Sequence, residues 1–115
     1  MLDQSERELE LDAMFHALAD PTRRSIVDQL MRGPASVSDL AAPFVMSLAA
    51  VLQHLRVLEQ SGLVQSQKEG RVRTCRIDAT ALRSVEDWIA ERRLGWERRL
   101  DRLGTLLAAD ANLHE

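Results

Sequence analysis

Two helix-start signals, separated by a proline, lie in the middle of the 115-residue sequence. Ser36 and Asp39 have the spacing of a capping box, in which each side chain satisfies a backbone N–H of the other residue. Pro43 ends the helix that begins there, because a proline disfavours the helical conformation of the residue before it. Ser47 then caps a second, longer helix. This order predicts a helix-turn-helix over about residues 36–59.

The helix that begins at Ser47 has two different faces. One arc of its helical wheel is apolar and is expected to face the core; it holds Leu48, Val51, Leu52, Leu55 and Leu58. The other arc holds Ala49, Ala50, Gln53, His54 and Arg56. Small residues let a helix backbone approach a surface closely, and Gln, His and Arg bond to base edges or phosphates. The second arc is therefore a candidate DNA-reading surface.

Two short runs after this helix predict a β-hairpin. Residues 64–68 and 71–77 read as strands, and Glu69-Gly70 between them is a two-residue turn signal. The basic side chains that flank the turn are Lys68, Arg71 and Arg73. Directly after a reading helix, such a hairpin can act as a wing, over residues 64–77, that reaches phosphates or the minor groove. The alternative is a solvated sheet edge that its own charges protect from pairing.

Two further helices precede the helix-turn-helix. The first is expected over about residues 8–19, with its apolar face formed by Leu11, Met14, Phe15 and Leu18. Asp20-Pro21 starts the second with an N-cap acid and a proline at the first helical position, and Gly33-Pro34 ends it. The predicted buried residues of the second helix are Ile26, Val27, Leu30 and Met31.

A last helix is predicted over about residues 79–109, with apolar residues at alternating three- and four-residue steps. Its near-heptad seam consists of Leu82, Val85, Ile89, Trp96, Leu100, Leu103 and Leu107, interrupted by Arg92, Gly95 and Gly104. One small subunit would cover little of this area, which predicts a homodimer. The apolar residues that a partner would cover are Trp88, Ile89, Trp96, Leu100 and Leu103. The alternative is that the seam packs within one subunit.

Composition and charge favour one folded domain over residues 1–115, since 45% of the residues are hydrophobic and 29% are charged. The formal net charge is −3, yet residues 47–76 hold five bases and two acids. The acidic start is unlike a signal peptide, and the longest uncharged run, residues 40–55, is shorter than the roughly 20 apolar residues of a membrane helix. With a single cysteine, Cys75, these features predict a cytoplasmic protein that does not enter a membrane.

Three stretches resemble one family: "HALADPTRRSIVDQL", "VSDLAAPFVMSLAAVLQHLRVLEQSGLV" and "KEGRVRTCRI". Over about residues 11–78 the chain looks like the ArsR-type (arsenic-repressor-like) winged-helix transcriptional regulators of bacteria. The resemblance implies a mainly α-helical winged helix-turn-helix fold with a small β-hairpin, and a homodimer built largely by the first and last helices. The interface residues that it implies are Leu11, Phe15, Trp88, Ile89, Trp96, Leu100 and Leu103. It also implies a repressor, often of its own promoter, that binds a palindromic double-stranded DNA operator until an effector weakens binding.

Carried over by position, Ser47 corresponds to the serine that opens the family's reading helix. Gln53, His54 and Arg56 match the polar stretch of that helix. Ala49 stands where the family commonly has proline, and Leu52 where many members have a serine that can touch DNA. The full set of expected DNA-binding residues is Ser47, Ala50, Gln53, His54, Arg56, Lys68, Arg71 and Arg73. Two further arginines, Arg23 and Arg24, either contact the DNA backbone or form a solvated face.

The metal sensing of this family is not expected here. Ser36 and Ser38 occupy the positions of the family's cysteine pair, and serine hydroxyls are poor ligands for thiophilic metals. The last helix carries acids but no histidine, and His16, His54 and His114 show no ligand spacing. No metal or other cofactor is therefore predicted.

Catalysis is not predicted either, because His54 has no nucleophile or orienting acid at a meaningful spacing and no Gly-rich phosphate loop occurs. Cys75 has two interpretations. It could be a thiol switch, since the neighbouring arginines Arg71, Arg73 and Arg76 could stabilise a thiolate. It could instead be a small buried hydrophobe that points inward with Ile77.

These features together predict a dimeric, sequence-specific DNA-binding repressor. The helix over residues 47–60 would enter the major groove, and the half-sites would lie about one helical turn apart, roughly 34 Å. The alternatives are a winged-helix protein-interaction module and a thiol-responsive regulator that acts through Cys75.

Overall fold

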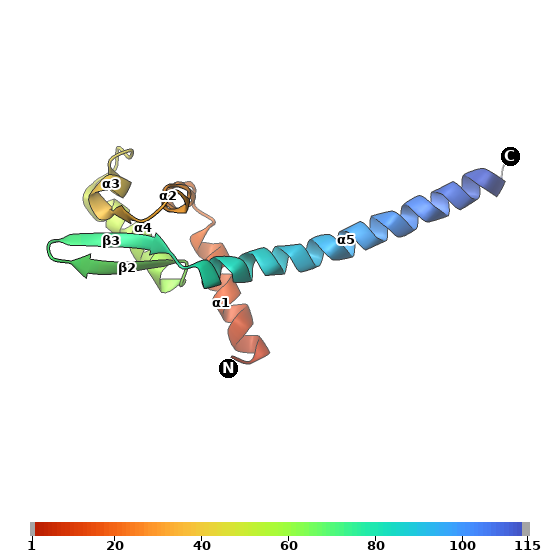
Figure 1. Cartoon of the computed structure of the whole chain (residues 1–115), viewed down its shortest axis with the longest axis horizontal. Helices are drawn as coiled ribbons and strands as arrows, with labels where there is room; N and C mark the ends of the chain where they lie inside the picture. The colour runs from red at the N-terminus through yellow and green to blue at the C-terminus, as the bar shows by residue number, and fades with distance from the viewer. Residues whose placement is uncertain (1, 114–115) are drawn as a thin grey trace. The chain divides into compact units, whose positions relative to one another are not determined.

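The computed structural model describes residues 2–113. The elements, in chain order, are α1 (Gln4–Ala17), α2 (Pro21–Met31), β1 (Ala35–Ser36), α3 (Val37–Ala41), α4 (Leu48–Gln60), β2 (Val64–Glu69), β3 (Val72–Ile77) and α5 (Ala79–Leu113) (Figure 1). This order confirms the predicted winged helix-turn-helix architecture. The chain divides into two compact units, one through Arg83 and one from Ser84, so the boundary lies within α5.

The sheet of the first unit has the order β1-β3-β2, with both pairs antiparallel. β3 is therefore the central strand: Cys75 pairs with Ala35 of β1 on one side and with Ser66 of β2 on the other. α4 packs on β2, and α2 and α3 pack on β3 (Figure 1). β1 was not predicted, because a two-residue strand has no periodicity to detect. It links the segment that precedes α3 to the inner strand of the hairpin.

The predicted starts of α2, α3 and α4 are confirmed, each by a side-chain cap. The Asp20 carboxylate accepts the backbone N–H of Arg23 at 3.0 Å. Ser36 Oγ accepts the N–H of Asp39 at 3.1 Å, and Ser47 Oγ accepts the N–H of Ala50 at 3.2 Å. Each bond satisfies one of the N–H groups that a helix leaves without a partner at its first turn. These caps fix where α2, α3 and α4 begin.

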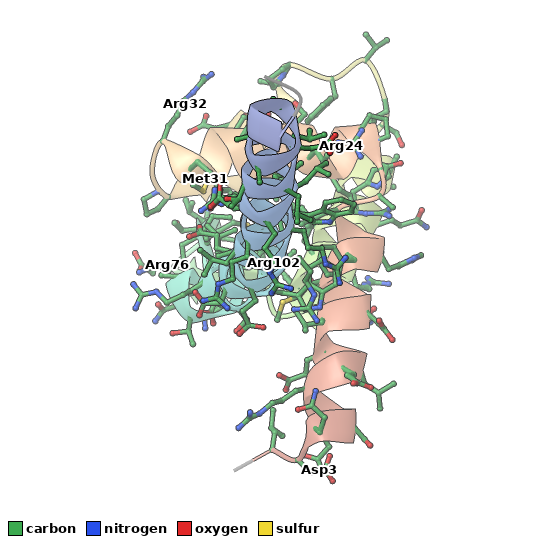
Figure 2. The ribbon with its side chains drawn as sticks, turned by 90° about the vertical axis from the view of Figure 1, so that its right-hand side faces the viewer. Asp3, Arg24, Met31, Arg32, Arg76 and Arg102 are labelled. Atoms are coloured by element: carbon green, nitrogen blue, oxygen red, sulfur yellow. The ribbon has the colours of Figure 1, made fainter. Side chains whose placement is uncertain are left out.

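Helix α1 begins at Gln4 rather than near residue 8, so its predicted start was wrong. Asp3 caps it, since its Oδ1 accepts the N–H of Glu6 at 2.8 Å, and Figure 2 shows Asp3 at the free end of the helix. The apolar pattern used for the prediction begins at Leu11, about two turns later than this cap. Periodicity marks the face of a helix that packs, whereas a polar first turn carries no such mark.

Helix α5 is continuous to Leu113, four residues beyond the predicted end at residue 109. Gly95 and Gly104 lie inside it without interrupting it, because a helical glycine lowers stability by only about 1 kcal/mol relative to alanine. Although α5 has 35 residues, neither it nor any other helix among residues 2–113 has an apolar stretch long enough to cross a membrane.

The hairpin turn lies one residue later than predicted. Glu69 still pairs with Val72, so β2 ends at Glu69 and the turn residues are Gly70 and Arg71. Gly70 has a φ of +64°, the left-handed conformation that a tight two-residue turn requires and glycine adopts freely. Arg71 consequently belongs to the turn rather than to a strand.

The core of the first unit includes residues from each of its four helices and from the hairpin. Its buried apolar residues are Met14, Ala17, Ile26, Val27, Leu30, Leu40, Val51, Leu55, Leu58, Leu63, Val64, Cys75 and Ala81. Three residues predicted to be buried are exposed instead: Met31 (58% exposed, Figure 2), Leu48 (55%) and Leu52 (40%). Met31 is the last residue of α2, where the helix leaves the core. The buried stripe of α4 is narrower than predicted and consists of Val51, Leu55 and Leu58.

Gly62, which follows the C-cap of α4, has a φ of +87°, and no heavy atom lies within 4 Å of a Cβ added there. Replacing Gly62 with alanine is therefore expected to lower the free energy of unfolding by about 1 kcal/mol, through backbone strain alone. Urea denaturation measures the change. Gly104→Ala is the matched control, because this glycine lies in α5 and its φ is not positive. The control should stabilise the chain by up to about 1 kcal/mol, and equal changes at both positions would contradict the strain explanation.

Candidate nucleic-acid interface

One face of α4 is exposed and carries no acidic side chain. Its residues are Leu48, Ala49, Leu52, Gln53, Arg56 and Gln60. Ser47, also exposed, precedes this face at the N-cap, where its Oγ holds the N–H of Ala50. Ala50 itself is half-buried at the edge. Of the residues expected to read DNA from α4, the structure thus places Ser47, Gln53 and Arg56 on one accessible surface.

His54 lies on a different side of α4 from Gln53 and Arg56. It is half-buried, and its Nδ1 is 3.3 Å from Nη1 of Arg23 and 3.7 Å from Oδ2 of Asp20. Asp20, Arg23 and His54 form a group that we call the Arg23 cluster. His54 thereby connects α4 to the first turn of α2.

Arg23 also extends the cluster to α1. Its Nε donates to the carbonyl of Ala17 at 2.6 Å, and its Nη2 donates to the carbonyl of His16 at 3.1 Å. The last carbonyls of a helix have no partner within the helix, so a guanidinium that reaches two of them acts as a C-terminal cap. One side chain of α2 therefore holds the end of α1 and, through His54, the middle of α4.

The charges of the Arg23 cluster are complementary. The backbone N–H of Arg23 lowers the pKa of Asp20, and the nearby charges of His54 and Arg23 lower it further, while partial burial opposes them. Asp20 is therefore ionised at neutral pH.

The sequence contained a signal for this cluster: Arg23 and Arg24 lie in the first turn of α2, where the helix dipole disfavours positive charge. Arg24 likewise donates to a carbonyl, that of Leu18, at 2.8 Å.

The hairpin presents its basic residues to solvent. Lys68, Arg71 and Arg73 are all exposed, and Lys68 lies directly opposite Arg73 in the register of β2 and β3. Arg73 Nη1 donates to Ser66 Oγ at 2.8 Å. Arg76, which was not included among the expected DNA-binding residues, is also exposed and projects away from the hairpin in Figure 2. The predicted wing is thus a positively charged surface.

A hollow of about 270 Å³ joins α4 to the hairpin. Arg56 of α4 and Arg73 of β3 both line it, together with Val37, Leu52, Leu55 and Glu59. The two groups of residues that the sequence suggested separately, on a helix and on a wing, therefore border a single surface. Arg56 and Arg73 are its two cations.

Cys75 is fully buried, at 0% exposure, on the central strand. Burial raises the pKa of its thiol, and the carboxylate of Glu59 raises it further, while the charge of Arg73 acts in the opposite direction. The interpretation in which neighbouring arginines stabilise a thiolate is not supported, because desolvation of the sulfur outweighs the charge of Arg73. Cys75 therefore behaves as a small core residue, as the second interpretation predicted.

Residues 2–113 contain no group of three or more His, Cys, Asp or Glu side chains that could hold a metal ion. Ser36, in the position of the family's first cysteine, uses its hydroxyl to cap α3. His114 lies outside the described residues.

The residues expected at a dimer interface lie on two helices. On α1, Leu11 and Phe15 are half-buried. On α5 the five apolar residues are exposed: Trp88, Ile89, Trp96, Leu100 and Leu103. Arginines stack on both tryptophans: Cζ of Arg92 is 4.1 Å from the ring centroid of Trp88, and Cζ of Arg99 is 5.8 Å from that of Trp96. In a single chain, α5 thus leaves a long apolar stripe uncovered.

Comparison with known proteins identifies the family of this chain. Residues 20–66 match a family model described as bacterial regulatory protein, arsR family. The HTH-type transcriptional regulator Rv2034 of Mycobacterium tuberculosis is 42% identical over 74 residues, which are 64% of this chain and 69% of that protein. The chain belongs to the ArsR family. A second family relative, the transcriptional repressor SdpR of Bacillus subtilis, is 29% identical over 69% of this chain and 88% of its own length.

Solved structures of ArsR-type regulators share the fold. The crystal structure of the ArsR family transcriptional regulator RHA00566 superposes with a TM-score of 0.72 at 49% identity, and the match covers 76% of this chain and 97% of that chain. A homodimeric winged helix-turn-helix DNA-binding domain from Mycobacterium bovis gives a TM-score of 0.61 at 26% identity, over 89% and 93% of the two chains. These ArsR-family relatives confirm that the protein is a DNA-binding transcriptional regulator and not an enzyme.

Proposed function

We propose that this ArsR-family protein is a homodimeric repressor that binds a palindromic operator. In this proposal α4 enters the major groove, and the β2–β3 hairpin contacts the adjacent backbone or minor groove. The observation that carries the proposal is the continuous surface on which the exposed face of α4 adjoins the hairpin, with Arg56 and Arg73 lining one hollow. Side chains on the helix can then reach base edges while the hairpin neutralises phosphates.

The placement of charge on the hairpin supports a polyanionic partner. Like charges directly opposite each other on neighbouring strands destabilise a sheet, and Lys68 faces Arg73 in this way. A phosphate bound beside the pair would relieve the repulsion. This argument favours the wing over a merely solvated sheet edge, which gains nothing from opposing two cations.

Within α4 we assign two different roles. Gln53 and Arg56, on the exposed face, contact the major groove. His54 instead positions the helix, because its Nδ1 is engaged by the Arg23 cluster. Arg23 and Arg24 serve the same scaffold through their bonds to the carbonyls at the end of α1 and just beyond it.

The exposed apolar stripe of α5 supports the homodimer. Large apolar patches on a small soluble chain commonly mark an interface. A two-fold dimer presents two α4 helices to half-sites roughly 34 Å apart, which is the arrangement that a palindrome requires. The homodimeric Mycobacterium bovis domain and the named repressor SdpR support the assembly and the direction of regulation, respectively.

Arg56→Ala is the variant that tests the reading surface. Loss of a guanidinium contact to DNA is expected to weaken binding about 10- to 100-fold, as for a side chain worth about 1–3 kcal/mol. The measurement is a titration, with the protein, of genomic fragments that contain the region upstream of its own gene. Footprinting follows, and both are done at two salt concentrations. Wild type should give a footprint and a steep loss of affinity with salt, because counterions are released from phosphates.

The matched control for charge is Arg7→Ala, which removes an exposed arginine from α1 and should leave the affinity within about twofold. Absence of both the footprint and the salt dependence in wild type would contradict the repressor proposal. It would favour a winged-helix module that binds another protein through the stripe of α5.

A further inference from the structure

Two leucines occupy the part of α4 that should lie deepest in DNA. Leu48 and Leu52 are 55% and 40% exposed, one helical turn apart, on the face that also carries Gln53 and Arg56. Both lie within the first five residues of α4. In helix-turn-helix proteins, the residues at the N-terminal end of the recognition helix contact base edges. The apolar side chains thus lie where direct readout takes place.

The surroundings of Leu52 identify the chemistry of its partner. It lines the hollow that also holds Arg56, Arg73 and one acid, Glu59, so that the cations outnumber the acid. An apolar protein surface would bury both guanidiniums without their water, at a large cost in solvation free energy. A polyanion with apolar groups exposed between its charges satisfies both features, and duplex DNA is such a partner.

The major groove contains one apolar group, the C5-methyl group of thymine. We propose that Leu48 and Leu52 contact thymine methyl groups, so that each operator half-site requires thymines at the positions these side chains reach. This inference rests on the proposed placement of α4 in the major groove. The helical rise separates the two Cα atoms by about 6 Å along the axis, close to two base-pair steps. The two methyl groups should therefore lie one or two steps apart.

The test begins with selection of binding sites from a pool of random duplexes by the full-length wild-type protein. In the enriched duplex, each thymine is then replaced singly by deoxyuridine, which lacks only the methyl group. Replacement at one or two positions per half-site should weaken binding roughly fourfold, the factor that corresponds to about 0.8 kcal/mol for one buried methyl group. Replacement at the remaining thymines should change the affinity less than about 1.5-fold.

The leucine variants assign the effect to a side chain. Leu52→Ala should bind the thymine and uracil duplexes equally at one position, and Leu48→Ala should do so at the other. Leu9→Ala is the matched control, because Leu9 is 68% exposed on α1, and it should keep the full discrimination of wild type. All three variants replace an exposed helical leucine with a good helix former, and thermal melting verifies that they fold.

Two results would overturn the inference while leaving the proposed function intact. One is salt-dependent binding to a selected site that no deoxyuridine replacement weakens. The other is discrimination that persists unchanged in both Leu48→Ala and Leu52→Ala. Failure of wild type to enrich any sequence, with no salt-dependent binding, would instead overturn the proposed function and the inference together.

Discussion

A chain that carries Leu100→Glu and Leu103→Glu is expected to sediment as a monomer of about 13.0 kDa, with DNA affinity reduced at least about 100-fold. Two carboxylates on the apolar stripe of α5 would have to be buried without partners in a dimer, which disfavours association strongly. A monomer then binds one half-site without the gain in affinity that comes from a second subunit tethered to it. Sedimentation velocity at micromolar concentration and titration of the same DNA fragment measure the two effects.

Leu94→Glu is the matched control for these charges. Leu94 is 50% exposed in α5, and it lies nine residues before Leu103, half a turn round the helix at 100° per residue. The control variant should remain a dimer and keep its affinity for DNA. A double variant that still sediments at twice the mass of the chain would show that the stripe is not the interface. Monomers from Leu94→Glu would place the interface on the opposite face.

Arg23→Ala is expected to lower the free energy of unfolding by about 2–3 kcal/mol. The change removes the donor that holds the carbonyls of Ala17 and His16, together with the 3.3 Å contact to Nδ1 of His54, and Ala17 is fully buried. Leaving a buried acceptor unsatisfied costs about 1–3 kcal/mol. Urea denaturation measures the loss. The same variant should bind DNA more weakly, because α4 loses the contact between His54 and the Arg23 guanidinium that helps to fix it on α2.

Arg24→Ala provides the comparison, since Arg24 is exposed and donates a hydrogen bond to the carbonyl of Leu18. Its effect should stay below about 1 kcal/mol. Combining Arg23→Ala with His54→Ala should give less than the sum of the two single losses, because both remove the same contact. Equal destabilisation by Arg23→Ala and Arg24→Ala would contradict the stabilising role assigned to the Arg23 cluster. So would free-energy losses of Arg23→Ala and His54→Ala that add up exactly in the double variant.

The helix starts were predictable from sequence because capping is local. Asp20, Ser36 and Ser47 each bond to an N–H three residues further along the chain, so their environment is contained in a short stretch of sequence. Gly62 was equally predictable, since the left-handed conformation at the end of a helix strongly favours glycine. Because these signals are local, the identity and order of the main helices and strands could be predicted, apart from the two-residue strand β1.

The faces of α4 could be predicted only in part. A helical wheel separates apolar from polar residues, but it does not show which apolar residues another element covers. Leu48 and Leu52 were therefore assigned to the core, although the buried stripe holds only Val51, Leu55 and Leu58. A surface that uses apolar side chains for binding has the same pattern as a core.

The position of His54 required the tertiary structure. Its contact residue Arg23 is 31 positions away in the sequence, and no local pattern joins the two. The helical wheel grouped His54 with Gln53 and Arg56 because all three fall on its broad arc opposite the leucines. The structure separates them, since adjacent residues point about 100° apart on a helix and only one side of α4 is free.

The central position of β3 defines which part of the hairpin could be exchanged between relatives. A chimera that replaces residues 64–77 as a block would also replace the strand that pairs with Ala35 and Ser36, next to the start of α3. A chimera limited to residues 68–72 changes only the turn and the residues beside it, and leaves that pairing intact. The transplantable portion of the hairpin is thus its tip, whereas its inner strand belongs to the scaffold that carries α3 and α4.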